Sequence, residues 1–283
     1  MIIYKPCSEV TISQIFEAFQ LGFSDYISPV KMEEEVFQAQ FFGPEGNQYD
    51  ISYIAFDGIH PIGLILSGIR LFDGVKTMRC GALCIAPNYR GKKISDELLK
   101  LHQEAAISRG CKQLFLEVIT ENHRAISFYR KHGYREATIM KYYSNPVDNI
   151  PVVANPSYSF IVTINYNIIK RTRDCLTSCH INWQSDTPYY ENNSKDLYLG
   201  IYEDDKLVAT LAATPRGKIN FLWVEPKYRM KGLANNLLLE AAKQLEAPKL
   251  TVCISSNALL EGFFRKMQFT KENIEQYEMY LPL

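Results

Sequence analysis

The stretch "LEVITENHRAISFYRKHGY", Leu116–Tyr134, decides the fold because its pattern of residue types occurs twice in the chain. The second copy is "TVCISSNALLEGFFRKMQF", Thr251–Phe269. Both copies have an apolar strand, an asparagine (Asn122 and Asn257), a short helix with paired aromatics, two basic residues and a closing aromatic. A pattern that returns once, at the same place in each half, predicts a repeated domain rather than a short-period solenoid.

Two side chains with acid–base chemistry occur only in the first copy. Alignment on the asparagines matches Glu117 with Val252 and Tyr129 with Phe264. A carboxylate can accept a proton and a phenol can donate one, whereas valine and phenylalanine carry no titratable group. The comparison therefore predicts chemistry in the first half and a chemically silent second half.

The length of the chain favours two domains. Its 283 residues exceed what one hydrophobic core usually needs, and 47% hydrophobic with 22% charged residues is a globular composition. The segment "NPVDNIPVVANPSY", residues 145–158, has three prolines and little periodicity. We therefore expect a catalytic domain in residues 1–150 and a non-catalytic domain in residues 151–283.

Composition also argues against several functions. The 31 basic and 31 acidic residues cancel, which disfavours a nucleic-acid partner. No long apolar stretch or signal peptide occurs, so no membrane segment is expected. The seven cysteines lack paired spacing and predict reduced thiols in the cytoplasm. Cys175, Cys179 and His180 have no second pair of ligands, so no metal is expected.

Hydrophobic periodicity predicts a mixed α+β domain. Three strand-like segments, 51–58, 61–74 and 77–87, are joined by turns typical of hairpins and should run antiparallel. An amphipathic helix within 91–110 then leads to strand 113–119, which must return parallel through a right-handed crossover. The second half repeats this order in shorter form.

Each half has a similar loop between a strand and its long helix. The loops are "APNYRGKKIS", Ala86–Ser95, and "EPKYRMKGLA", Glu225–Ala234. In both, a proline ends the strand and an arginine leads into the N-terminus of the helix. Free backbone N–H groups and the positive end of the helix dipole suit a pyrophosphate.

This order of elements resembles the GCN5-related N-acetyltransferase (GNAT) family, whose loop has the pattern R-x-x-G-x-G/A. The second loop, Arg229–Ala234, fits it fully, and the first, Arg90–Ser95, departs at Lys93 and Ser95. Residues 116–144 look especially like the ribosomal-protein alanine N-acetyltransferases of this family. The resemblance implies two tandem GNAT-type domains, each a mixed, mostly antiparallel sheet with a central βαβ crossover and splayed parallel strands.

The resemblance also implies transfer of an acetyl group from acetyl-CoA to a primary amine by direct attack. Glu117 is expected to act as the base and Tyr129 as the acid that protonates the leaving thiolate; Glu121 and His123 stay open as alternative bases. The backbone at Leu83, Cys84 and Ile85 would bind the oxyanion, and Asn122 would cap its helix or bond the pantetheine arm. The residues expected to hold the cofactor are Leu83, Cys84, Ile85, Arg90, Gly91, Lys92, Lys93, Ile94, Ser95 and Asn122, and in the second domain Arg229, Lys231, Gly232, Leu233 and Ala234.

Two other hypotheses stay open, because the first half departs from the loop pattern at Lys93 and Ser95 and the second half lacks the acid and the base. One is a non-catalytic acyl-CoA sensor or scaffold, and the other is an enzyme that holds its cofactor at the C-terminal loop. The acceptor is expected to be a small-molecule or peptide amine. The resemblance at Glu136–Tyr143 slightly favours a peptide amine. A monomer is preferred over a homodimer, because two domains fused in one chain can take the place of the two subunits of a dimer.

Overall fold

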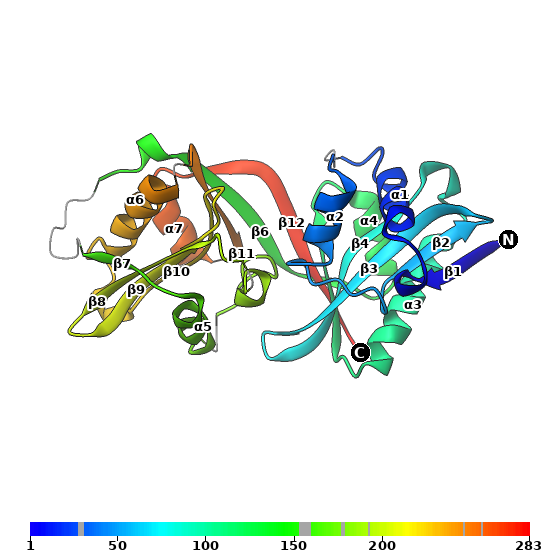
Figure 1. The fold of residues 1–283 in the computed structure, drawn as a ribbon, viewed down its shortest axis with the longest axis horizontal. Helices are drawn as coiled ribbons and strands as arrows, with labels where there is room; N and C mark the ends of the chain where they lie inside the picture. Colours follow the sequence, from blue (N-terminus) through cyan, green and yellow to red (C-terminus); the bar gives the residue numbers. More distant parts are fainter. Residues whose placement is uncertain (28–30, 153–159, 177–178, 192, 246, 256) are drawn as a thin grey trace. The chain divides into compact units, whose positions relative to one another are not determined.

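The computed structural model of the chain describes residues 1–27, 31–152, 160–176, 179–191, 193–245, 247–255 and 257–283 (Figure 1). It divides into two compact units. Unit 1 contains residues 1–137 together with 276–283, and unit 2 contains residues 138–275. No helix among the described residues is long and apolar enough to span a membrane.

Unit 1 is a mixed sheet with helices on both faces (Figure 1). Its strands lie in the order β1 (Ile2–Pro6), β2 (Tyr53–Asp57), β3 (His60–Phe72), β4 (Val75–Ile85), β5 (Gln113–Ile119) and the end of β12 (Thr270–Pro282). Helices α1 (Ile12–Gly22) and α2 (Glu34–Phe41) cover one face, and α3 (Ile94–Ser108) and α4 (His123–Lys131) cover the other. All neighbours are antiparallel except β4 and β5, which α3 connects as the predicted crossover.

The parallel strands β4 and β5 form a fork. They pair only from Thr77 to Cys80 on β4 and from Gln113 to Leu116 on β5. Beyond this point β4 continues to Ile85 paired with β3 alone, so one edge of its backbone is free toward the fork. Glu117 is the first residue of β5 past the last paired position.

The alternation of β5 sends its side chains to opposite faces of the sheet. Leu116 belongs to the core formed with α3, which also contains Leu98 and Leu99. Phe115 points the other way and contacts Phe72 at a ring-centroid distance of 5.0 Å. Glu117 follows the parity of Phe115, so it lies on the face opposite to α3.

Unit 2 repeats this architecture in shorter form. Its strands lie in the order β6 (Arg135–Pro146), β11 (Lys249–Ser255), β10 (Lys218–Val224), β9 (Lys206–Ala213), β8 (Leu197–Glu203) and β7 (Ile161–Thr163). Helix α5 (Tyr166–Asp174) covers one face, and α6 (Leu233–Leu245) and α7 (Ala258–Lys266) cover the other. Its parallel pair, β10 and β11, joins only at Lys218–Ile219 and Thr251–Val252.

The units differ from the predicted division at residue 150 in one respect. Strand β6 pairs along Met140–Pro146 with β11 of unit 2, and β12 pairs along Gln276–Pro282 with β5 of unit 1. The last strand of unit 1 therefore comes from the far end of the chain, and the division falls at residues 137/138 and 275/276. The last part of the proline-rich segment, residues 153–158, lies outside the described residues.

The register of β11 corrects one match made on sequence. Val252 pairs with Ile219 and belongs to the core under α6, which is the place that Leu116 has in unit 1. Because side chains alternate along a strand, Cys253 and not Val252 has the parity of Glu117. Alignment on Asn122 and Asn257 missed this, since the second copy is one residue shorter between strand and helix.

A buried histidine on α3 makes the stability of unit 1 sensitive to acid. His102 is fully buried and its Nδ1 lies 2.7 Å from Ser67 Oγ. Burial lowers its pKa from the ordinary 6.5 to about 3. The neutral ring thus stabilises the fold above pH 6.5, and this contribution is lost as the pH falls, because the unfolded chain takes up the proton first.

We expect the free energy of unfolding to fall by about 1.4 kcal/mol for each pH unit below 6.5, in addition to other acid effects. Urea unfolding between pH 7 and 5 measures this slope, and His102→Gln should reduce it. His60→Gln, which removes an exposed imidazole, is the matched control. Equal slopes for wild type and His102→Gln would show that His102 is not the titrating group.

Candidate active site

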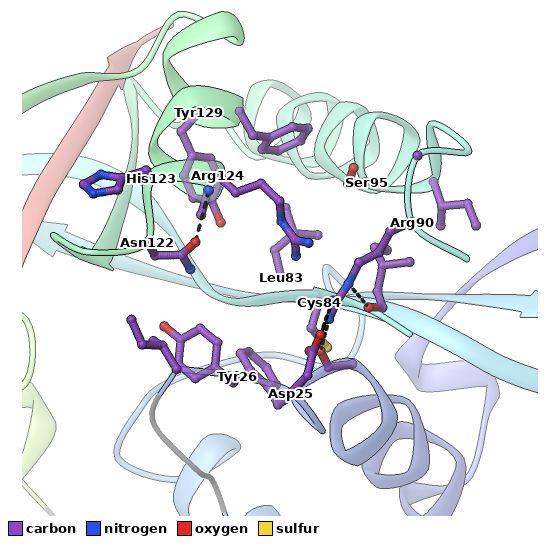
Figure 2. A pocket seen from close by; sticks show the side chains of 18 of the residues that line it. Asp25, Tyr26, Leu83, Cys84, Arg90, Ser95, Asn122, His123, Arg124 and Tyr129 are labelled. Atoms are coloured by element: carbon purple, nitrogen blue, oxygen red, sulfur yellow. Dashed lines mark hydrogen bonds and ion pairs between the residues drawn. The ribbon is translucent and has the colours of Figure 1, made fainter. Parts of the chain in front are cut away.

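Unit 1 has a cavity of about 550 Å³ beside the fork. Its walls are the end of β4, the first turn of α3, the start of α4 and the segment after α1 (Figure 2). These elements meet here because β4 and β5 diverge, and because each strand leads into a helix at the same edge of the sheet.

Most predicted site residues of unit 1 are brought together at this cavity. It is lined by Leu83, Cys84, Ile85, Arg90, Gly91, Ile94, Ser95, Asn122 and Tyr129, and also by the alternative bases Glu121 and His123. Three predicted residues do not line it, namely Lys92, Lys93 and Glu117. The Nζ of Lys92 lies instead 4.6 Å from the centroid of the Tyr89 ring.

The loop before α3 has the same backbone shape as its counterpart before α6. In the first loop the left-handed residues are Gly91 (φ 77°) and Lys93 (φ 63°); in the second they are Met230 (φ 61°) and Gly232 (φ 86°). Each loop thus has glycine at one left-handed position and a larger residue at the other, which costs on the order of 1 kcal/mol. Lys93 takes the conformation that the family pattern assigns to glycine.

The N-terminus of α3 has the properties of an anion site. Lys93 is its N-cap residue and makes no side-chain capping bond, so no side chain of the cap takes up the first N–H groups of the helix. A Cβ placed on Gly91 would meet nothing within 4 Å, which leaves room for a ligand beside the backbone. Free N–H groups at the positive end of a helix fit a pyrophosphate.

Arg90 is fixed at the mouth of this anion site. Its Nε donates to the carbonyl oxygen of Ile85 at 3.0 Å, and its Nη2 donates to that of Gly22 at 3.2 Å. Both ends of the guanidinium also pair with the carboxylate of Asp25, at 2.5 and 2.6 Å (Figure 2). Asp25 lies after α1, 65 residues before Arg90 in the sequence. No local sequence pattern indicates that these two residues form a pair.

Asn122 and Tyr129 come from the same helix. Asn122 Oδ1 accepts a hydrogen bond from the backbone N–H of Ala125 at 3.2 Å, which is the capping role expected of it. Tyr129 lies two turns further along and is 8% exposed. Burial raises its pKa well above the ordinary value, and a hydrogen bond with Cys80 adds to this. The phenol therefore keeps its proton at neutral pH.

Glu117 lies on the other face of the sheet, in a buried ion-pair network. Its Oε2 accepts from Arg79 at 2.5 Å (Nη2) and 2.8 Å (Nε), and Arg79 Nη1 pairs with Glu45 at 2.6 Å. Burial raises the pKa of Glu117, and the positive charge of Arg79 opposes that shift. Among the described residues, Glu117 Oε1 has no hydrogen-bond partner.

The segment after α1 supplies cavity residues that the sequence analysis did not identify. On α1 itself, Phe16 and Phe19 pack in the core with Phe37. Tyr26 lines the cavity and forms a hydrogen bond with Asn122. Arg124, at the start of α4, also reaches into the cavity (Figure 2).

The corresponding loop of unit 2 keeps part of this arrangement. Arg229 Nε donates to the carbonyl oxygen of Val224 at 3.2 Å, as Arg90 does to Ile85. Gly232 precedes α6, which begins with the buried Leu233 and continues through Ala234, and Lys231 lies over the Tyr228 ring at 4.8 Å. Phe264, at the place of Tyr129, is 1% exposed. Unit 2 thus has the turn but not the phenol.

Two sequence matches identify the family. Residues 12–134 match the acetyltransferase (GNAT) family, and residues 180–283 match an acetyltransferase (GNAT) domain. The chain belongs to the GNAT family, with two GNAT domains in tandem. It is an N-acetyltransferase, of the acyltransferase class, as the sequence predicted.

Curated GNAT relatives align with part of this chain. The N-alpha-acetyltransferase 30 of Schizosaccharomyces pombe is 28% identical over 111 residues, which are 38% of this chain and 73% of that protein. The thialysine N-epsilon-acetyltransferase of Sus scrofa is 28% identical over 117 residues, which are 38% of this chain and 68% of that protein.

Solved GNAT structures share the fold along the whole chain. A GCN5-related N-acetyltransferase from Sphaerobacter thermophilus has a TM-score of 0.71 at 12% identity and covers 99% of this chain and 95% of its own. A tandem GNAT protein from the clavulanic acid biosynthesis pathway has a TM-score of 0.72 at 14% identity and covers 100% and 98%. The predicted fold class is confirmed: each unit is a mixed, mostly antiparallel GNAT sheet with a βαβ crossover and splayed parallel strands.

Proposed function

We propose that unit 1 transfers an acetyl group from acetyl-CoA to a primary amine by direct attack, with Glu117 as the base and Tyr129 as the acid. One observation carries the proposal. Tyr129 and Glu117 approach the fork between β4 and β5 from opposite faces of the sheet, just past the last paired residues, Cys80 and Leu116. An amine and a leaving thiolate need these two groups on opposite sides of one carbonyl.

The residues at the cavity fit the acyl donor. Arg90, Gly91, Ile94 and Ser95 would hold the pyrophosphate at the N-terminus of α3, with Lys92 and Lys93 at its edge. Acetyl-CoA supplies the activated acetyl group. Beyond Cys80 the backbone of β4 is paired on one side only, so N–H groups at Leu83 to Ile85 can face the fork and stabilise an oxyanion.

Glu117 removes the proton of the incoming ammonium. Its Oε1 is free to accept that proton, while Arg79 holds the other oxygen in place. The Glu117 side chain is 5% exposed, so an acceptor reaches it only when the residues that bury it move aside. Glu121 and His123 line the cavity at the start of α4, the helix that also carries Tyr129, which suits them less well as the base.

Tyr129 protonates the thiolate of CoA as it departs. The raised pKa keeps the phenol protonated, and the side chain faces the cavity that would hold the donor. Unit 2 lacks this acid, because Phe264 replaces it, and has a thiol, Cys253, instead of the carboxylate. We therefore assign unit 2 a structural or substrate-shaping role.

The acceptor belongs to the primary amines of peptides or small molecules. The names of the two curated relatives, an N-alpha- and a thialysine N-epsilon-acetyltransferase, cover both kinds. We place the protein in the cytoplasm, where all seven cysteines, which are free, would stay reduced. We also propose that one chain is the active unit.

Release of CoA thiol in the presence of amines tests the proposal. The panel should contain peptides with free N-termini, the same peptides blocked at the N-terminus but carrying lysine, thialysine and a polyamine. The proposal predicts acetyl-CoA-dependent thiol release with at least one amine, matched by acetylated product. Tight acetyl-CoA binding without turnover on the whole panel would favour the sensor or scaffold hypothesis.

A further inference from the structure

Asp25 accepts hydrogen bonds from the N–H groups of Arg90 that a pyrophosphate would need. Arg90 directs one N–H of Nε, one of Nη1 and two of Nη2 at protein oxygens, which is four of its five donors. Two of these four bonds go to Asp25. Paired in this way, the guanidinium has a single N–H left and its charge is balanced by a carboxylate.

Among the described residues, Asp25 is the one carboxylate that pairs with Arg90, so it decides how far the charge of the guanidinium is balanced. The other two acceptors are the backbone carbonyls of Ile85 and Gly22, and these fix the position of the guanidinium without cancelling its charge. Hydrogen bonds to Arg90 lower the pKa of Asp25, so the carboxylate stays charged at neutral pH. The Asp25 side chain is 52% exposed and the Arg90 side chain 21%, so the pair is open to an incoming anion.

The same segment makes a second contact across the cavity. Tyr26, next to Asp25, lies across the cavity from Asn122, which is at the start of α4 (Figure 2), and the two side chains form a hydrogen bond. The segment after α1 therefore touches two residues assigned to the cofactor, one through each of these neighbouring side chains. An anion that displaced Asp25 would detach one of the two contacts.

Unit 2 provides a comparison within the same chain. Arg229 makes the equivalent bond to the strand carbonyl, at Val224, but no ion pair is found for it among the described residues. The two loops thus present similar arginines, one balanced by a carboxylate and one not. The difference comes from Asp25 rather than from the loop.

We propose that Asp25 is an internal competitor of the cofactor pyrophosphate, and that it sets the affinity of the unit 1 site by occupying Arg90 until a phosphate group replaces it. The inference rests on the proposed function in placing CoA at this cavity. Charge-assisted, two-pronged bonds to phosphate can replace those to a carboxylate with little change in geometry, so the exchange moves mainly Asp25 and not Arg90.

Calorimetric titration of CoA tests the inference by binding alone, without turnover. All variants should carry Arg229→Gln, so that a site in unit 2 does not contribute. Asp25→Asn is expected to tighten CoA binding roughly 3- to 10-fold, since a carboxylate competitor is removed. Arg90→Lys is expected to weaken it, because lysine cannot form the two-pronged contact.

Asp50→Asn is the matched control. Asp50 pairs with Arg109 in another exposed Asp–Arg ion pair, at the end of α3 about 20 Å from the anion site. The Asp50→Asn substitution removes the same charge as Asp25→Asn and should leave the affinity for CoA unchanged. Unchanged or weaker CoA binding by a folded Asp25→Asn variant, or equal tightening by Asp50→Asn, would overturn the inference. Failure of Arg90→Lys to weaken binding would also overturn the inference, because the guanidinium would then not hold the pyrophosphate. Loss of all CoA binding in the Arg229→Gln background would instead place the cofactor in unit 2 and contradict the proposed function.

Discussion

Replacing Tyr129 by phenylalanine is expected to lower kcat by roughly 10- to 10³-fold, because the leaving thiolate loses its general acid. The change removes a single hydroxyl from a residue that lines the cavity. Acetyl-CoA affinity should hardly change, since the ring still fills its place between Phe128 and Tyr134. Steady-state kinetics at saturating acetyl-CoA, with a parallel binding titration, separates the two effects.

Unit 2 supplies the matched control for this prediction. Phe264→Tyr creates the hydroxyl that unit 2 lacks at the corresponding place on α7. It should leave turnover unchanged, provided that thermal unfolding shows the variant to be folded, because a new buried hydroxyl without a partner costs about 1–3 kcal/mol. Similar losses from Tyr129→Phe and Phe264→Tyr would contradict the assignment of the acid.

Replacing Glu117 by glutamine is expected to lower kcat/KM for the acceptor amine by roughly 10²- to 10⁴-fold, because the amide cannot take the ammonium proton. Glutamine keeps the size of the side chain and an oxygen for Arg79. The affinity for acetyl-CoA, measured without the amine, should therefore stay unchanged. Measuring kcat/KM for the amine together with acetyl-CoA binding distinguishes loss of the base from loss of the fold.

The pH dependence gives a second test of Glu117. A base must be ionised to act, and the raised pKa of Glu117 moves the acidic limb of the kcat/KM profile above the ordinary carboxyl value of 4.5. That limb should disappear in Glu117→Gln. Glu121→Gln, which removes a carboxylate of the cavity wall, should keep it. If the limb moved with Glu121 instead, that residue and not Glu117 would be the base.

The sequence predicted the parts of the fold that local patterns determine. Alternating and helical periodicities placed the crossover helix between two parallel strands, as α3 lies between β4 and β5. The loop with Arg90 and the helix with Asn122 and Tyr129 could be assigned to one cavity because each follows a strand of the fork. These features depend on residues that are close together in the sequence.

Features that depend on distant pairing could not be predicted in the same way. The exchange of β6 and β12 between the sequence halves depends on pairings more than 100 residues apart, which alternation does not specify. The match of Glu117 with Val252 was wrong because one residue fewer in the second copy reverses the face of the strand. The pairing of Asp25 with Arg90 depends on how α1 packs against the sheet.

The position of the CoA sulfur tests the central claim most directly. A crystal structure with CoA should show the pyrophosphate at Arg90 and the sulfur within about 4 Å of the Tyr129 hydroxyl, on the side of the fork opposite to Glu117. CoA bound only at Arg229 in unit 2, or a sulfur in unit 1 far from Tyr129, would contradict the account.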